Sequence, residues 1–148
     1  MKIRPYTSND FAPVTQFWRH SREVALPEFE RIKGHSYEED CAYFKNHILV
    51  ENDVYVVEIN GMPVGFLAIK DDFIDRLYVA PKHQRQGIGR SLLEFARSLS
   101  PKHLWLYTLQ INLNARTFYE KNGFVATKLG ISPPPESEPD VMYEWNTA

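Results

Sequence analysis

Two glycines and several basic side chains lie close together in the segment VAPKHQRQGIGRS, Val79 to Ser91. The basic side chains are Lys82, Arg85 and Arg90, together with His83. Gly87 and Gly89 allow a close approach to the backbone, and no acidic residue interrupts the segment. The first turn of a helix presents unpaired amides and a partial positive charge. If a helix begins here, the pattern predicts a site for a phosphate or pyrophosphate group.

The residue types alone leave a second interpretation open, in which the glycines only shape a turn and the basic side chains form a solvated face. Two well-known phosphate loops do not fit. A dinucleotide fingerprint requires a third glycine where Leu92 stands, and a P-loop requires Gly-Lys followed by Ser or Thr.

The elements around this turn follow from apolar periodicity. The run FIDRLYV predicts a strand that ends at Ala80-Pro81. After the turn, apolar residues recur at helical spacing and predict one face of a helix: Ile88, Leu92, Phe95 and Leu99. Upstream, VYVVEINGMPVGFLAI predicts a β-hairpin, since Asn60-Gly61 suits a two-residue turn with positive φ. The basic turn therefore lies between a strand and a helix start.

The rest of the chain supplies further helices and strands. We expect a strand at 2–6, a helix ending near His20, an irregular segment at 21–35, a helix at 36–48, a strand at 103–111, a helix capped by Asn114 and ended by Gly123, a strand at 124–130, a loop at 132–139 and a last strand at 140–145. The prediction is one α/β (α+β) domain, residues 1–148, with a mixed, mostly antiparallel central sheet flanked by helices.

Composition excludes several classes of protein. With 148 residues, 43% of them hydrophobic, the chain is long enough to bury a core. A net charge of −2 gives no field that attracts nucleic acid, and no apolar run is long enough to span a membrane. A single cysteine, Cys41, fits a reducing compartment. We expect a soluble, cytoplasmic protein with no nucleic-acid or membrane partner.

Two sequence blocks together carry a resemblance to a known family. The first is Gln84-Arg85-Gln86-Gly87-Ile88-Gly89, a Q-x-x-G-x-G between a strand and a helix. The second is NLNARTFYEKNGF, Asn112 to Phe124, which matches N-x-x-A-x-x-F-Y-x-x-x-G-F. The chain resembles the GNAT superfamily of acyl-CoA-dependent N-acyltransferases, and the predicted order of elements follows that fold along nearly the whole sequence.

The resemblance implies where coenzyme A would bind. The pantetheine arm would pair with the backbone of the strand before the loop, as an added strand does. The pyrophosphate would lie on the amides at the start of the helix. Asn112 matches a family asparagine that contacts the cofactor. The implied cofactor-binding residues are Leu77, Tyr78, Val79, Arg85, Gln86, Gly87, Ile88, Gly89, Arg90, Asn112 and Tyr119.

Two catalytic residues are expected. Tyr119 matches the family tyrosine that faces the thioester sulfur, and a phenol with a pKa near 10 can protonate a thiolate whose pKa is near 8.5. Its alternative is one more packed aromatic beside Phe118 and Phe124. An attacking ammonium, with a pKa near 10.4, must lose a proton. Asp75 is the nearest carboxylate in sequence to the cofactor strand, although ordered water is an alternative base.

The acceptor side is expected to involve the 21–35 segment and the proline-rich loop. These would bring Trp18, Phe29, His35 and Tyr37 near Glu136, Glu138 and Asp140. Acids beside aromatics suit a cationic amine, although loop acids are more often solvated. Some relatives that modify protein N-termini carry a carboxylate where this chain has Tyr107, which argues against that acceptor. The histidines form no metal-ligand spacing, so no metal is expected.

The sequence thus predicts an N-acetyltransferase that uses acetyl-CoA and acetylates a primary amine by direct attack. The acceptor is a small-molecule amine or a protein amine, and a homodimer is possible because edge strands in such domains often pair. Two alternatives remain: a non-catalytic acyl-CoA-binding module, and a phosphate-binding protein unrelated to coenzyme A, which would leave the second sequence block unexplained.

Overall fold

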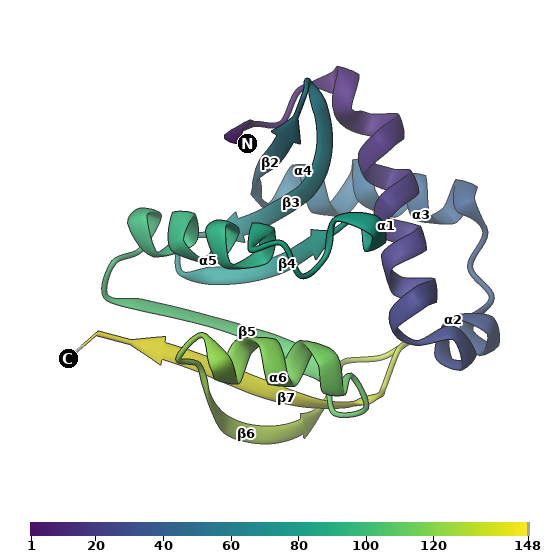
Figure 1. The fold of residues 1–148 in the computed structure, drawn as a ribbon. Helices are drawn as coiled ribbons and strands as arrows, with labels where there is room; N and C mark the ends of the chain where they lie inside the picture. Colours follow the sequence, from purple (N-terminus) through teal and green to yellow (C-terminus); the bar gives the residue numbers. More distant parts are fainter. Residues whose placement is uncertain (148) are drawn as a thin grey trace.

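The computed structural model describes residues 1–147 and contains one seven-stranded sheet with the order β1-β2-β3-β4-β5-β7-β6 (Figure 1). The strands are β1 (Lys2–Pro5), β2 (Asp53–Ile59), β3 (Met62–Lys70), β4 (Phe73–Val79), β5 (His103–Leu109), β6 (Val125–Ile131) and β7 (Pro139–Asn146). All neighbours are antiparallel except β4 and β5. The predicted fold class is confirmed.

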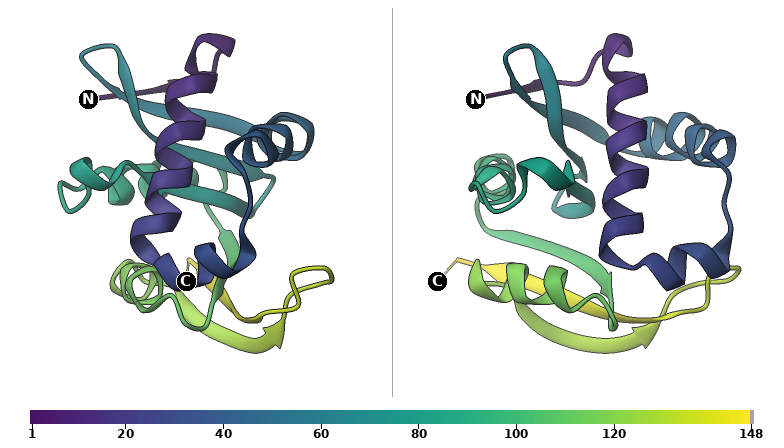
Figure 2. Two further views of the ribbon diagram at one scale, coloured as in Figure 1. Left: turned by 90° about the vertical axis from the view of Figure 1, so that its right-hand side faces the viewer. Right: turned by 45° about the vertical axis from the view of Figure 1, so that its right-hand side comes forward.

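Helices cover both faces of the sheet (Figures 1 and 2). They are α1 (Phe11–Ala25), α2 (Pro27–Lys33), α3 (Tyr37–Tyr43), a π-helical turn (Phe44–Ile48), α4 (Leu49–Glu51), α5 (Ile88–Leu99) and α6 (Leu113–Lys121). One core lies under α5 and α6 and includes the fully buried Leu92 and Leu93. The second lies under α1 and the π-helical turn, where Phe44 packs edge-on against Phe66. Each such buried side chain contributes about 2 kcal/mol.

The parallel pair β4 and β5 is joined only at one end. Phe73 of β4 is in register with Trp105 of β5, and the Trp105 amide donates to the Asp72 carbonyl at 3.0 Å. Beyond that point the two strands diverge toward their carboxyl ends (Figure 1). The inner edges of β4 and β5 are therefore unpaired along most of their length, an arrangement that we call the splay.

Several sequence predictions are confirmed by the local geometry. Asn60 and Gly61 have φ angles of 52° and 80°, and Ile59 faces Met62 across the hairpin. These angles suit the two-residue turn that Asn-Gly predicts. The strand at 73–79 and the helix start at Ile88 also fall where they were predicted.

Other predictions were wrong. The segment 21–35 is not irregular: α1 continues to Ala25 and α2 follows directly, with Pro27 at its first position, where proline lacks no needed hydrogen bond. Leu99 is 44% exposed, because α5 ends there beyond the edge of the core. The cap of α6 is Asn112, whose side-chain oxygen accepts from the Ala115 amide at 3.2 Å, and not Asn114.

Candidate active site

The loop between β4 and α5 leaves a row of amides free at the helix start. Gly87 caps α5 with φ of 82°, and Arg85 has φ of 63°, a left-handed conformation that is uncommon for a side-chain-bearing residue. Within residues 1–147, the amides of Arg85–Arg90 have no backbone acceptor; the first bond of the helix is Ser91 to Gly87. Such amides, with the helix dipole behind them, are suited to bind an anion.

Glycine is needed at positions 87 and 89 of the loop for different structural reasons. A Cβ added at Gly87 would meet no described atom within 4 Å, so only the positive φ favours glycine at this position. A Cβ at Gly89 would come within 3.0 Å of the Phe118 ring. Gly89 therefore lets α5 and α6 pack closely, which leaves Gly87 as the more informative position for testing anion binding.

The two arginine side chains of the loop are exposed to solvent. Arg85 makes no ion pair among the described residues, and Arg90 pairs only with Glu94 one turn along α5, at 3.3 Å between two exposed groups. Both guanidinium groups are therefore free to move toward an anion on the loop. Exposed pairs of this kind are weak, so the Glu94 contact opposes such a movement little.

Strand β4 directs alternate backbone groups into the splay. The Ala80 amide donates to the Val64 carbonyl of β3 at 2.8 Å, and Tyr78 lies opposite Phe66. Because hydrogen-bonded residues alternate in an antiparallel pair, Leu77 and Val79 turn their amides and carbonyls away from β3. The three predicted pantetheine residues therefore differ. The Tyr78 backbone pairs with β3 and its ring stacks on Phe66, whereas the backbone groups of Leu77 and Val79 point into the splay.

One group at the open end of the splay is already occupied. The Val79 carbonyl accepts from the Ser21 hydroxyl at 2.9 Å and from the Gln84 side chain at 3.0 Å. These bonds fix α1 and the loop against the end of β4. Since the Val79 carbonyl already has two donors, the groups left unpaired on the splay side, within the described part of the chain, are the Leu77 amide, the Leu77 carbonyl and the Val79 amide.

Tyr119 projects from α6 into the core and is 8% exposed. Its ring packs against Phe118, Phe124 and Tyr143. Burial raises the pKa of Tyr119, and the neighbouring Tyr78 of β4 raises this pKa further. A phenol is protonated through the neutral range even at its ordinary pKa of about 10, and this upward shift leaves it so.

The other two predicted site residues also have structural partners. The Asn112 oxygen caps α6, so the sequence prediction gave the cap to the wrong asparagine. Asp75 lies at a register shift of β4, where its carboxylate accepts from the Asn52 amide group at 2.8 Å and lies 3.4 Å from Arg76. Roles for Asn112 in cofactor binding and for Asp75 as a base stay predictions.

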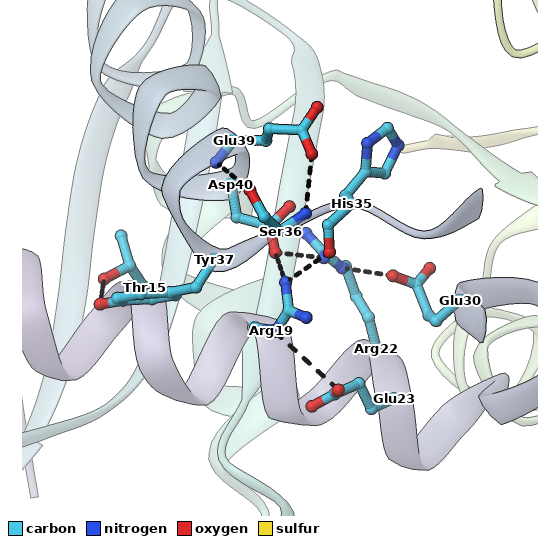
Figure 3. Close-up of polar contacts among 10 residues, drawn as sticks. All are labelled: Thr15, Arg19, Arg22, Glu23, Glu30, His35, Ser36, Tyr37, Glu39 and Asp40. Carbon is cyan, nitrogen blue, oxygen red and sulfur yellow. Dashed lines mark hydrogen bonds and ion pairs between the residues drawn. The ribbon is translucent and has the colours of Figure 1, made fainter. Parts of the chain in front are cut away.

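The expected acceptor side contains an ion-pair network that sequence reasoning missed (Figure 3). Asp40 of α3 is 5% exposed, and one of its oxygens lies 2.8 Å from both Arg19 and Arg22 of α1. Arg22 also contacts Glu30 of α2 at 3.2 Å. The helical spacing of the two arginines was visible in the sequence, but nothing local identified a partner on a separate helix. The network fixes α2 relative to α1 and α3.

The aromatic residues predicted for the acceptor side differ in their burial and in their partners. Trp18 is 3% exposed and belongs to the core, and the Tyr37 hydroxyl bonds Thr15 at 2.8 Å. Phe29 is half-buried and His35 is exposed. The structure does bring α2 to the loop 132–138, where Lys33 contacts Glu138 at 3.0 Å.

Comparison with known proteins identifies the family. Residues 51–126, more than half of the chain, match the family model described as an acetyltransferase (GNAT) domain. The chain is 38% identical over 128 residues to the peptidyl-lysine N-acetyltransferase YjaB of Salmonella typhimurium, covering 86% of this chain and 85% of that protein. The chain belongs to the GNAT acetyltransferase family.

Two further relatives agree with this assignment. The peptidyl-lysine N-acetyltransferase YiaC of Escherichia coli is 28% identical over 123 residues, which cover 82% of each chain. The solution structure of apo-form YjaB from Escherichia coli has a TM-score of 0.78 at 24% identity and covers 99% of this chain and 98% of that chain, which shows a common GNAT fold.

As a GNAT protein, the chain is an N-acetyltransferase that uses acetyl-CoA. The sequence-based prediction of an enzyme is confirmed, in preference to the non-catalytic module and the unrelated phosphate-binding protein. None of the helices described for this GNAT domain is long and apolar enough to cross a bilayer. Residues 1–147 hold no cluster of three or more His, Cys, Asp or Glu arranged for a metal ion.

Proposed function

We propose that this acetyltransferase transfers the acetyl group of acetyl-CoA to the ε-amine of a protein lysine, by direct attack of the amine on the thioester. The observation that supports this mechanism best is Tyr119, a buried and protonated phenol beside Tyr78 of β4. The choice of lysine is supported by two relatives that are named peptidyl-lysine N-acetyltransferases.

The proposed cofactor position uses the free backbone groups. The pyrophosphate would lie on the amides of Arg85–Arg90, with the Arg85 and Arg90 side chains near the phosphates. The pantetheine would pair with Leu77 and Val79 inside the splay, and Asn112 would contact it from the start of α6. These contacts are supported by the unpaired amides and by the alternation of hydrogen bonds along β4.

The proposed chemistry balances in one displacement. The amine nitrogen forms a bond to the acetyl carbon, and the carbon–sulfur bond breaks. Tyr119 gives its proton to the leaving thiolate and regains one from solvent, while the proton of the attacking ammonium passes to Asp75 or to water. Holding the thiol in its protonated form makes it a far poorer nucleophile, which opposes the reverse reaction.

The base can be tested separately. If Asp75 takes the proton, Asp75→Asn lowers kcat/KM at pH 7 by about 100-fold, and the loss shrinks at higher pH as the free amine forms by itself. A loss of kcat/KM that is the same at every pH would show instead that Asp75 only holds Asn52.

We further propose that the single domain spans residues 1–148 and acts in the cytoplasm, and that any second copy pairs along the edge strand β6.

Acetyl transfer to lysine is tested by incubating the protein with acetyl-CoA and each of three acceptors: lysine peptides, peptides with only a free N-terminus, and small amines. Thiol release gives the rate, and mass spectrometry locates the acetyl group. The proposal predicts modification of the lysine side chain and requires Tyr119 for it. Turnover of small amines alone would reject lysine as the acceptor without affecting the acetyltransferase assignment.

A further inference from the structure

A lysine of the protein itself occupies an ammonium site on the acceptor side. The Lys33 ammonium lies 3.0 Å from a Glu138 oxygen, 3.3 Å from the Glu136 carbonyl oxygen and 5.3 Å from the centre of the Phe29 ring. A carboxylate, a carbonyl and an aromatic face are three kinds of group that stabilise a primary ammonium ion. We call this set the Lys33 site.

The Lys33 site joins parts of the chain that are far apart in sequence. Phe29 and Lys33 are four residues apart on α2, so they lie on one face of that helix, and the two glutamates belong to the loop 132–138. The right view of Figure 2 shows α2 beside this loop. Because Ser21 bonds the Val79 carbonyl, the last part of α1, which leads into α2, lies at the open end of the splay, where the proposed acetyl transfer would take place.

One wall of the site is held in place independently of Lys33. Glu30 of α2 contacts Arg22, which is anchored by the buried Asp40 (Figure 3). The position of Phe29 therefore does not depend on the Lys33–Glu138 pair. The side chains of Lys33 and Glu138 are 25% and 33% exposed, so the pair is within reach of solvent. Pairs of that exposure are weak, and another cation displaces Lys33 at small cost.

We propose that Glu138, the Glu136 carbonyl and Phe29 form a subsite for a cationic side chain that flanks the acceptor lysine, and that Lys33 occupies this subsite as an internal competitor. The inference rests on the proposed lysine acetylation, because a peptide acceptor is what brings a second cation to the site. Lys33 then sets substrate preference: it weakens binding of basic acceptors more than binding of neutral ones.

The test is a binding experiment that needs no turnover. Peptides carry norleucine in place of the acceptor lysine and arginine at one of three positions on either side; matched peptides carry citrulline, which is neutral and nearly the same shape. Affinities are measured by calorimetry with the CoA-loaded protein. The ratio of the citrulline Kd to the arginine Kd, at the best position, is expected to be about 3 in the unchanged protein, about 10 in Lys33→Ala and about 1 in Glu138→Gln.

A matched control lies on the same helix. Arg31 pairs with Glu28 at 2.8 Å, fully on the surface, so Arg31→Ala removes a cation from α2 without touching the Lys33 site and should leave the ratio at its starting value. Equal ratios in the unchanged protein, Lys33→Ala and Glu138→Gln would overturn the inference. If Glu138→Gln unfolds, the Lys33→Ala ratio decides alone.

The two proposals fail in different ways. A protein that shows the expected ratios but acetylates no lysine peptide would refute the proposed function and keep only the cation-binding site itself. A protein that acetylates lysine with ratios that do not respond to Lys33 would do the reverse.

Discussion

The proposed cofactor side and the proposed acceptor side of this acetyltransferase are built from different kinds of contact. On the cofactor side, β4 and the start of α5 present backbone amides whose positions depend on the strand and on the φ of Gly87. On the acceptor side, α1, α2, α3 and the loop 132–138 are joined by side-chain ion pairs such as Asp40 with Arg22. The first kind depends on nearby residues and the second on residues far apart in sequence. We therefore expect substitutions to affect the two sides separately.

The largest expected effect is on the chemical step, and it leaves both binding sides intact. Tyr119→Phe removes the proton donor and keeps the ring that packs against Phe124. We expect kcat for lysine acetylation to fall about 100-fold, since general acid catalysis contributes at least that much. The acetyl-CoA Kd, measured by calorimetry, should stay within about twofold. A variant with normal kcat would show that Tyr119 is only a packed aromatic.

The next effect concerns the cofactor side alone. Gly87→Asp places a carboxylate at the free amides, and we expect the acetyl-CoA Kd to rise about 30-fold because of charge repulsion and loss of the amide geometry. Arg85→Ala with Arg90→Ala should raise this Kd only about fivefold, because the amides remain.

Gly61→Asp is the matched control for the change at Gly87. Gly61 has φ of 80° and also has open space where a Cβ would stand, but it lies in the hairpin. This control should lose similar stability and bind acetyl-CoA normally. An equal loss of affinity in both variants would mean that Gly87→Asp acts through general destabilisation.

The third effect concerns the acceptor side alone. Asp40→Asn leaves Arg19 and Arg22 without their shared carboxylate, so α2 loses its anchor. We expect the acceptor KM to rise about tenfold with acetyl-CoA affinity unchanged, and the free energy of unfolding to fall by about 2 kcal/mol, since both arginines keep partial access to water.

Asp10→Asn controls for stability in this comparison. Asp10 is 3% exposed and pairs with Arg4 at 2.8 Å, at the opposite end of α1. It should destabilise the protein similarly and leave the acceptor KM as it was. A KM that rises equally in both variants would show that the network has no special relation to the acceptor.

The same contrast explains what the sequence allowed us to predict. Asn60-Gly61, the glycine-spaced turn and the strand at 73–79 are specified by neighbouring residues, and each was placed correctly. The extension of α1 to Ala25 and the existence of α2 were missed, because charged residues there gave no apolar period and their partner, Asp40, lies on another helix. Asn112 and Asn114 have similar capping propensity, so local chemistry did not decide between them.

The smallest expected effect lies at the closed end of the splay and depends on pH. His103 of β5 has Asp72 at 2.8 Å from one ring nitrogen and Glu144 of β7 at 3.1 Å from the other. Two carboxylate acceptors require both nitrogens to carry hydrogen, which is the imidazolium form. Asp72 first, and then Glu144, raise the pKa of His103 above the ordinary value of 6.5.

A raised folded-state pKa fixes the sign of this effect. The stabilisation is fully present below about pH 6.5 and is lost as pH rises through the higher pKa of the folded protein. At the acid end the stabilisation fades again, because protonated Asp72 carries no charge. His103 holds the pKa of Asp72 below its usual value, so this loss occurs at a lower pH than for a free aspartate. His103→Gln should therefore cost about 1 kcal/mol near pH 6 and less at pH 9, measured by urea unfolding. A cost independent of pH would contradict the charged pair.

The central claim is that coenzyme A binds in the splay, with its pyrophosphate on the amides of Arg85–Arg90. The most direct test is an amide-resolved NMR titration of the ¹⁵N-labelled protein with coenzyme A. We predict that the largest shifts occur at these six amides and at Leu77 and Val79, while amides of the Gly61 hairpin stay in place. Saturable shifts confined to other parts of the protein, with these amides unmoved, would contradict the account.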